Sequence, residues 1–150
     1  MSNTFNIATV LAIGASLALQ PPINAAMARI LGSPLLAASI SIAVSFIVVV
    51  LFWLTWGKAA GDLGQLRALP WWVTLGGVIG FSFVVGGVLV APALGVGLFF
   101  VCVVAGQLVG SILTDHFGAF GMPVKPINLM KLLGLGLVLA GTALVRNSDG

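Results

Sequence analysis

Two sets of polar residues recur at helical spacing within a mostly apolar chain. Their side chains can form hydrogen bonds or exchange protons. They are Ser16, Gln20 and Asn24 in the first set and Gln107, Ser111 and Asp115 in the second. Residues four apart share one face of an α-helix. Amides and hydroxyls on such a face can hydrogen-bond a small polar molecule, and a carboxylate can also exchange a proton.

A pair of prolines, Pro21 and Pro22, interrupts the first set between Gln20 and Asn24. Proline lacks a backbone N–H, so it leaves the carbonyl four residues earlier without its helical donor. Broken helices at membrane depth often line a binding cavity. We therefore predict a helix break at Pro21 and Pro22. The alternative is that the polar groups only hydrogen-bond neighbouring helices around a bend.

Asp115 is the carboxylate that lies closest to a polar set, and it is the candidate for coupling or gating. Its predicted place at a helix end, before Gly118, leaves a capping or loop carboxylate as the alternative. His116 is adjacent and points about 100° away on a helix, so an Asp–His dyad is not expected. A lone histidine is not a metal site, and we predict neither a metal nor a cofactor.

The composition shows which kind of element must position these residues. Hydrophobic residues make up 60% of the 150 residues and charged residues 6%, whereas a soluble domain has about 25% charged residues. The lipid bilayer must therefore supply most of the chain's solvent. The apolar runs lack the period-two alternation of a membrane barrel. We predict an all-α membrane protein with a single domain over residues 1–150.

Charged and helix-breaking residues divide the chain into five predicted transmembrane helices. The uncharged stretch from Ala68 to Thr114 would run about 70 Å as one helix, against a hydrocarbon core of about 30 Å. It must fold back, and the sequence Ala91-Pro92-Ala93-Leu94-Gly95 is the predicted corner, placed at Pro92. Gly32, Ser33 and Pro34 are typical of a helix C-cap, an N-cap and a first helical residue. The predicted helices cover residues of about 5–30, 34–56, 71–91, 95–114 and 127–146.

Four cations against two give a modest bias toward an N-terminus inside the cell. Lys58, Arg67, Lys125 and Lys131 would lie on one face, and Arg29 and Arg146 on the other. This bias is weak under the positive-inside rule, and it permits insertion in both orientations. A chain that inserts both ways can form an antiparallel two-fold dimer with inverted-repeat architecture.

Glycines at helical spacing predict close helix packing, because small residues let backbones approach each other in lipid. The pairs are Gly106 with Gly110 and Gly134 with Gly141. Their contacts could lie within one chain or between two chains.

Several classes of function are excluded by what the sequence lacks. A single cysteine, Cys102, excludes an intramolecular disulfide and a cysteine zinc site. The net charge of +3 is too small and scattered for a nucleic-acid patch. The sequence shows no nucleophile with a base, no metal cluster and no soluble catalytic loop, so we predict that the protein is not an enzyme.

Several motifs together resemble the YdcZ family of the drug/metabolite transporter superfamily, over nearly the whole chain. They are Gln20–Asn24 with Arg29–Pro34, Pro70–Trp72 with Gly76–Gly77, Ala91–Gly95, Gly106–Ser111 and Asp115–Gly118. The resemblance implies a multi-pass bacterial inner-membrane transporter. Residues 70–146 are more distantly similar to small multidrug resistance proteins, in which the final helix, here carrying Gly134 and Gly141, mediates antiparallel dimerisation. The chain departs from those proteins by an extra helix and by lacking their membrane-embedded glutamate.

Two functional hypotheses follow. The first is a small secondary transporter that exports a metabolite or drug-like compound by alternating access, as an antiparallel homodimer or as a heterodimer with a close relative. Its predicted substrate-binding residues are Gln20, Asn24, Gln107 and Ser111. The second is a membrane subunit that stabilises a partner without transporting, in which the same residues only lock helices together.

Overall fold

The computed structural model describes residues 3–57 and 63–148, and over these residues the chain is all-helical. Lys58, used above to assign the membrane faces, lies outside the described residues. The helices long and apolar enough to cross a membrane are Phe5–Leu31, Pro34–Thr55, Trp71–Leu94, Val96–Phe117 and Leu129–Asn147. The predicted helical class and the count of five spans are confirmed. At most 17% of the most apolar stretch of any span is buried, so lipid must cover the rest.

The contacts within the chain group it into two compact units, Met1–Ala93 and Leu94–Gly150, and each is described by itself. The predicted single domain stays a prediction. The first unit contains α1 (Asn3–Leu17), α2 (Gln20–Leu31), α3 (Pro34–Phe52) and most of α4 (Leu75–Leu94). Short π and 3₁₀ segments join α3 to α4; they are Trp53–Gly57, Leu63–Ala68 and Trp71–Thr74.

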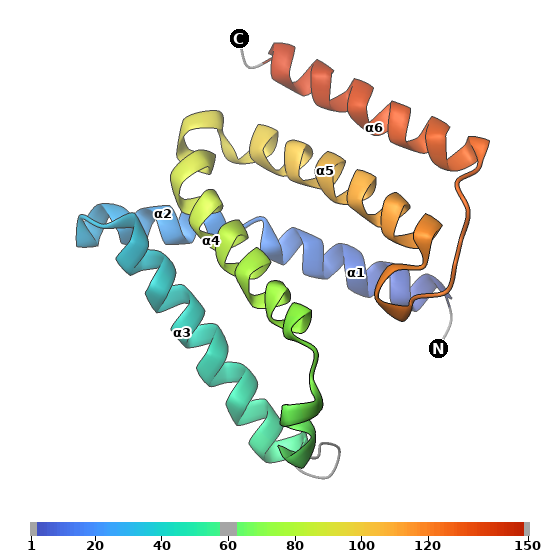
Figure 1. The fold of residues 1–150 in the computed structure, drawn as a ribbon. Helices are drawn as coiled ribbons and strands as arrows, with labels where there is room; N and C mark the ends of the chain where they lie inside the picture. The colour runs from blue at the N-terminus through green and yellow to red at the C-terminus, as the bar shows by residue number, and fades with distance from the viewer. Residues whose placement is uncertain (1–2, 58–62, 149–150) are drawn as a thin grey trace. The chain divides into compact units, whose positions relative to one another are not determined.

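Helices α2 and α3 are joined by a short turn and contact each other, and they diverge from that turn (Figure 1). Gly32 ends α2 in the left-handed conformation, with φ 67° and ψ 11°. The Ser33 hydroxyl oxygen then accepts a hydrogen bond from the Leu36 N–H at 3.2 Å, and Pro34 begins α3. The predicted caps at these residues are confirmed. Ala37 and Ala38 of α3 are buried, as expected where small side chains let two helices approach closely.

The predicted corner, Ala91–Gly95, contains the break between two helices, but the break lies at Gly95 rather than at the expected Pro92. Pro92 lies inside α4, which continues to Leu94. The helix is interrupted at Gly95, where φ is 81° and ψ is 148°, and α5 begins at Val96. A proline removes one helical N–H without forcing the backbone out of the helical region, whereas a positive φ with an extended ψ is accessible almost only to glycine.

The second unit pairs α5 (Val96–Phe117) with α6 (Leu129–Ser148), and the two helices lie side by side (Figure 1). A 3₁₀ turn over Ala119–Gly121 starts their connection. Helix α5 ends at Phe117 rather than at the predicted residue 114, so Asp115 lies in its last turn. Helix α6 starts at Leu129, after Asn128, whose side-chain oxygen accepts a hydrogen bond from the Lys131 N–H at 2.9 Å.

Candidate functional site

The first membrane span is interrupted between α1 and α2. Helix α1 ends at Leu17, and α2 begins at Gln20 with prolines in its first turn. The Leu19 N–H donates to the Ser16 carbonyl at 3.1 Å, which tightens the last turn of α1. Pro21 and Pro22 have no N–H to give to the carbonyls of Leu17 and Ala18. The interruption therefore exposes main-chain acceptors within an apolar span.

Asn24 is the polar side chain that the fold buries most completely among the described residues. It is 3% exposed, and its amide makes no hydrogen bond to the residues that the structure describes. Among the described residues, no side-chain polar atom is both fully enclosed and unpaired. Gln20, one turn earlier on the same helix, is half-buried.

Burying an amide without a partner costs about 1–3 kcal/mol relative to a paired one. Asn24 and Gln20 together form an uncharged polar face next to the helix interruption. A ligand, a water molecule or a second chain could satisfy the hydrogen-bonding groups of this face.

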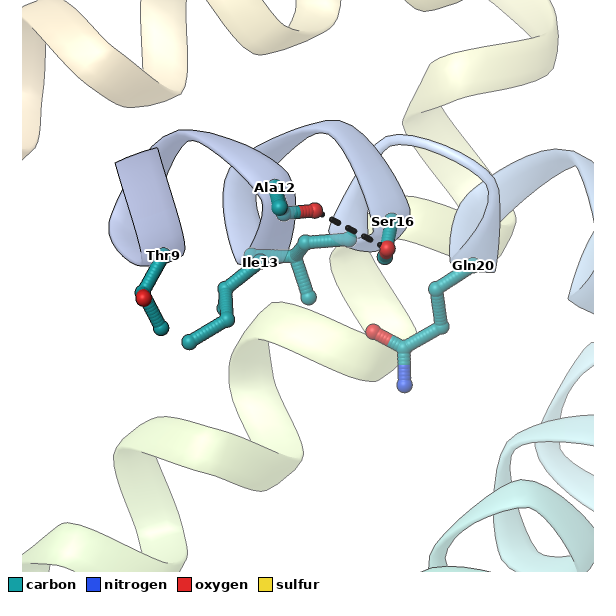
Figure 2. A pocket seen from close by; sticks show the side chains of 6 residues that line it. Thr9, Ala12, Ile13, Ser16 and Gln20 are labelled. Atoms are coloured by element: carbon teal, nitrogen blue, oxygen red, sulfur yellow. Dashed lines mark hydrogen bonds between the residues drawn. The ribbon is translucent and has the colours of Figure 1, made fainter. Parts of the chain in front are cut away.

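A shallow hollow follows the same face of α1 up to the interruption (Figure 2). Its lining residues are Thr9, Ala12, Ile13, Ser16, Leu17 and Gln20. Figure 2 shows the Ser16 hydroxyl turned to its own helix, where it donates to the Ala12 carbonyl at 2.9 Å. Ser16 is therefore already satisfied, whereas the Gln20 amide beside the hollow makes no hydrogen bond to a described residue.

The second polar set lies on an uninterrupted helix, α5. Gln107 and Ser111 are both exposed. The Ser111 hydroxyl donates to the Leu108 carbonyl at 2.9 Å, within its own helix. These residues belong to the second unit, and Gln20 and Asn24 belong to the first. Gln20 and Asn24 share one face of α2, and Gln107 and Ser111 share one face of α5.

Asp115 takes part in a clasp that ties α6 to α5. Its carboxylate lies 3.6 Å from the ammonium of Lys131. The same ammonium donates to the Lys125 carbonyl at 2.9 Å, and the Lys125 N–H donates to the Asp115 carbonyl at 2.8 Å. Lys131 was not predicted as the partner of Asp115. Its opposite charge in the first turn of the next helix was a signal, but the path of the loop decides whether the two charges meet.

A groove of about 400 Å³ runs between α5 and α6 from this clasp. Ser111, Asp115 and Lys131 form its polar end. The rest of its lining is apolar or glycine and comprises Leu108, Ile112, Gly134, Leu135 and Val138. Of the predicted site residues, Ser111 and Asp115 thus share one groove.

His116 and Gly118 complete the connection between the two helices. The Nδ1 atom of His116 accepts a hydrogen bond from the Ile127 N–H at 3.3 Å, so this imidazole fixes the loop. Gly118 has φ +59°, and a Cβ there would lie 2.7 Å from Cγ2 of Val124. No group of three or more potential metal ligands occurs within residues 3–57 and 63–148.

The glycines predicted to pack helices have free space beside them. A Cβ added at Gly106, Gly110, Gly134 or Gly141 would meet nothing within 4 Å. Packing of the described residues within the second unit therefore does not use the close approach that these glycines permit.

Five apolar spans, one of them broken beside a buried amide, define a multi-pass membrane protein with polar groups at membrane depth. Residues 5–144 match the family described as "Putative inner membrane exporter, YdcZ". The match covers most of the chain, and the protein belongs to this YdcZ family. The chain is also 24% identical over 147 residues to "Inner membrane protein YdcZ" of Escherichia coli (strain K12), with 97% of each chain covered. No solved structure matches the chain significantly.

The family assignment confirms the resemblance found in the sequence motifs. It places the protein in the inner membrane as a multi-pass protein, as predicted. It also assigns the chain to a family of membrane exporters rather than enzymes.

Proposed function

We propose that the protein is a secondary exporter of a small metabolite or drug-like compound and that it works by alternating access as a unit of two chains. Two chains would supply ten membrane helices, a set comparable with larger transporters built from inverted repeats. The pair is an antiparallel homodimer or a heterodimer with a close relative. Alternating access then requires that the pair interconvert between two states of similar free energy, each open to one face.

The observation that carries the proposal is the environment of Asn24. Its side chain is 3% exposed and has no hydrogen-bond partner among the described residues. It closely follows the prolines that free the carbonyls of Leu17 and Ala18. Unpaired donors and acceptors at membrane depth are costly unless a polar molecule visits them. Asn24 and Gln20 are therefore proposed to bind the substrate directly.

Gln107 and Ser111 are proposed as the second part of the substrate site. They offer an amide and a hydroxyl on one face of α5, at the same four-residue spacing as Gln20 and Asn24. Asp115, at the end of that face, is proposed as the gating residue. Its ion pair with Lys131 joins α5 to α6, so a movement of α6 relative to α5 would have to break or remake it.

The exposed residues of α6 support the proposal that two chains assemble. Met130, Leu137 and Leu144 are 78%, 76% and 71% exposed. They alternate with Gly134 and Gly141 at steps of four and three residues, the spacing that keeps one stripe facing a partner helix. Large residues of one α6 can then fill the space over the glycines of another. In an antiparallel pair, Met130 of one chain would lie near Leu144 of the other.

Flux through reconstituted protein tests the proposed site. Liposomes containing the protein are loaded with a mixture of small metabolites, and efflux is followed by mass spectrometry against protein-free liposomes. Asn24→Leu is expected to reduce the protein-dependent efflux to background, because leucine fills a similar volume without hydrogen-bonding groups. Asn147→Leu, at the exposed end of α6, is the matched control and should leave efflux unchanged. Full efflux by correctly folded Asn24→Leu would refute the site assignment.

A further inference from the structure

We propose that a pocket beside Arg29 binds an anionic group, a carboxylate or a phosphate, carried on a small apolar body. The pocket has a volume of about 420 Å³ and lies within the first unit, between α2, the start of α3 and the end of α4. Ala25, Ala28, Arg29, Pro34, Val88 and Pro92 are among its lining residues. Its lining includes none of Gln20, Asn24, Gln107 and Ser111, and the inference does not depend on the proposed function.

The space exists because α2 presents alanines toward α4. Ala25 and Ala28 lie three residues apart and so share one side of the helix, and both line the pocket. Val88 on α4 contributes an apolar wall. The volume falls within the range of about 300–1,000 Å³ of small-molecule pockets. A larger side chain at Ala28 would therefore occupy the space directly.

Arg29 gives this apolar pocket its charge. Its guanidinium makes no ion pair with a described residue, since the carboxylate of Asp115 pairs with Lys131 in the second unit. Arg29 lies close to Leu31, the end of the first membrane span. Its side chain is exposed, so an anion from outside the protein can reach it beside the apolar walls of the pocket. The planar fork of the guanidinium matches the two oxygens of a carboxylate or phosphate.

The charge and the walls together define the ligand class. An anionic head bonds to Arg29, and the apolar body contacts Ala25, Ala28 and Val88. An amphipathic cation of the same shape is repelled, and a neutral analogue loses the charge-assisted bond. Two sources can supply this chemistry, the headgroup of an anionic phospholipid or a free organic anion.

Three probes of matched shape test the charge preference: 4-phenylbutanoate, 4-phenylbutanol and 4-phenylbutylammonium. Binding to the full chain in phosphatidylcholine nanodiscs is measured by titration, with protein-free nanodiscs subtracted. We expect the carboxylate to bind at least tenfold more tightly than the ammonium. Arg29→Gln should abolish that preference. Arg146→Gln, the loss of another exposed cation near a helix end, should leave it intact. An equal loss of the preference for the carboxylate in the two variants would overturn the proposal.

A second pair of variants separates the pocket from the charge. Ala28→Leu keeps Arg29 but fills the cavity, and it should weaken 4-phenylbutanoate binding at least tenfold. Ala143→Leu, which changes an exposed alanine on α6, is its control. Unchanged binding by Ala28→Leu would show that Arg29 acts as an ordinary surface cation, and the proposal would fail.

The source of the anion is distinguished by adding phosphatidylglycerol to the nanodiscs. Competition that lowers 4-phenylbutanoate binding to the wild type, and disappears in Ala28→Leu, identifies the lipid headgroup as the occupant. Retention of the probe in the presence of the anionic lipid identifies a free organic anion. Efflux measured in parallel keeps this result distinct from the proposed function, because loss of the pocket does not require loss of the Asn24 site.

Discussion

The two polar sets have the same spacing along their helices, yet the structure treats them differently. On the first span the helix stops at Leu17 and restarts at Gln20, and Asn24 is buried without a partner among the described residues. On α5 the helix is continuous, Ser111 bonds its own backbone, and Asp115 is held by Lys131. Equal spacing therefore does not imply equal roles. The first set has unsatisfied hydrogen-bonding groups for a ligand, whereas the second is mostly satisfied within its own unit.

Healing the interruption should produce the largest effect. The double substitution Pro21→Ala and Pro22→Ala restores two backbone N–H groups and lets α1 and α2 join. We expect efflux to fall at least tenfold while the thermal stability stays the same or rises. Efflux from liposomes and amide exchange over residues 16–24 measure the two properties. Pro126→Ala, in the exposed connection before α6, is the control, and normal efflux through a continuous first helix would contradict the account.

Two left-handed glycines, Gly32 and Gly118, allow the turns of the two units to be compared. Gly32→Ala adds only left-handed strain, about 1–2 kcal/mol, because a Cβ there meets nothing within 4 Å. Gly118→Ala adds the same strain and places a Cβ 2.7 Å from Val124 Cγ2 and 3.0 Å from the Met122 carbonyl oxygen. We expect Gly118→Ala to lower the free energy of unfolding by about 1 kcal/mol more than Gly32→Ala. Unfolding in mixed micelles measures both, and equal losses would show that the α5–α6 connection relaxes freely.

Breaking the clasp should have a smaller effect on stability. Asp115→Asn removes an ion pair between partly exposed groups, and such pairs contribute about 0–1 kcal/mol. If the pair gates transport, efflux falls several-fold despite that small loss. The exchanged pair Asp115→Lys with Lys131→Asp should then recover most of the efflux. Failure of the exchanged pair together with normal folding would indicate that the carboxylate itself, rather than the pair, is required.

Removing hydroxyls that already donate to their own helices should have the smallest effect on the free energy of unfolding. Ser16→Ala and Ser111→Ala are each expected to change the free energy of unfolding by less than about 0.5 kcal/mol.

Gln107→Leu removes the neighbouring amide, which makes no hydrogen bond to a described residue, and it should lower efflux more than Ser111→Ala. If Ser111→Ala lowered efflux as much as Asn24→Leu, the proposed difference between the two polar sets would be contradicted.

Much of the fold could be predicted because the bilayer imposes it. Few charges and a fixed hydrocarbon thickness leave five spans as the simplest division of the chain. The caps at Gly32, Ser33 and Pro34 follow from local backbone chemistry, which depends only on neighbouring residues. The segment Ala91–Gly95 does contain the helix break, but the break falls at Gly95 rather than at Pro92, because a proline weakens a helix without ending it, whereas Gly95 takes a conformation that other residues avoid.

The candidate site was predictable only in part. Helical spacing groups Gln20 with Asn24, since both lie on one continuous face of α2. The pairing of Asp115 with Lys131 depends on the path of the loop between them, and that path depends on tertiary contacts such as the bond from Ile127 to His116. The walls of the Arg29 pocket come from two distant parts of the sequence, residues 25–34 and residues 88–92. No periodic pattern marks such a cavity.

The pairing of two α6 helices is the most direct test of the proposed two-chain exporter. In a Cys102→Ala background, chains carrying Met130→Cys are mixed in membranes with chains carrying Leu144→Cys, and disulfide-linked pairs are identified by mass spectrometry. Met130 and Leu144 lie equally far from Leu137, on the same exposed stripe. An antiparallel dimer predicts links between position 130 of one chain and position 144 of the other. Links that join only identical positions would show a parallel pair and contradict the account.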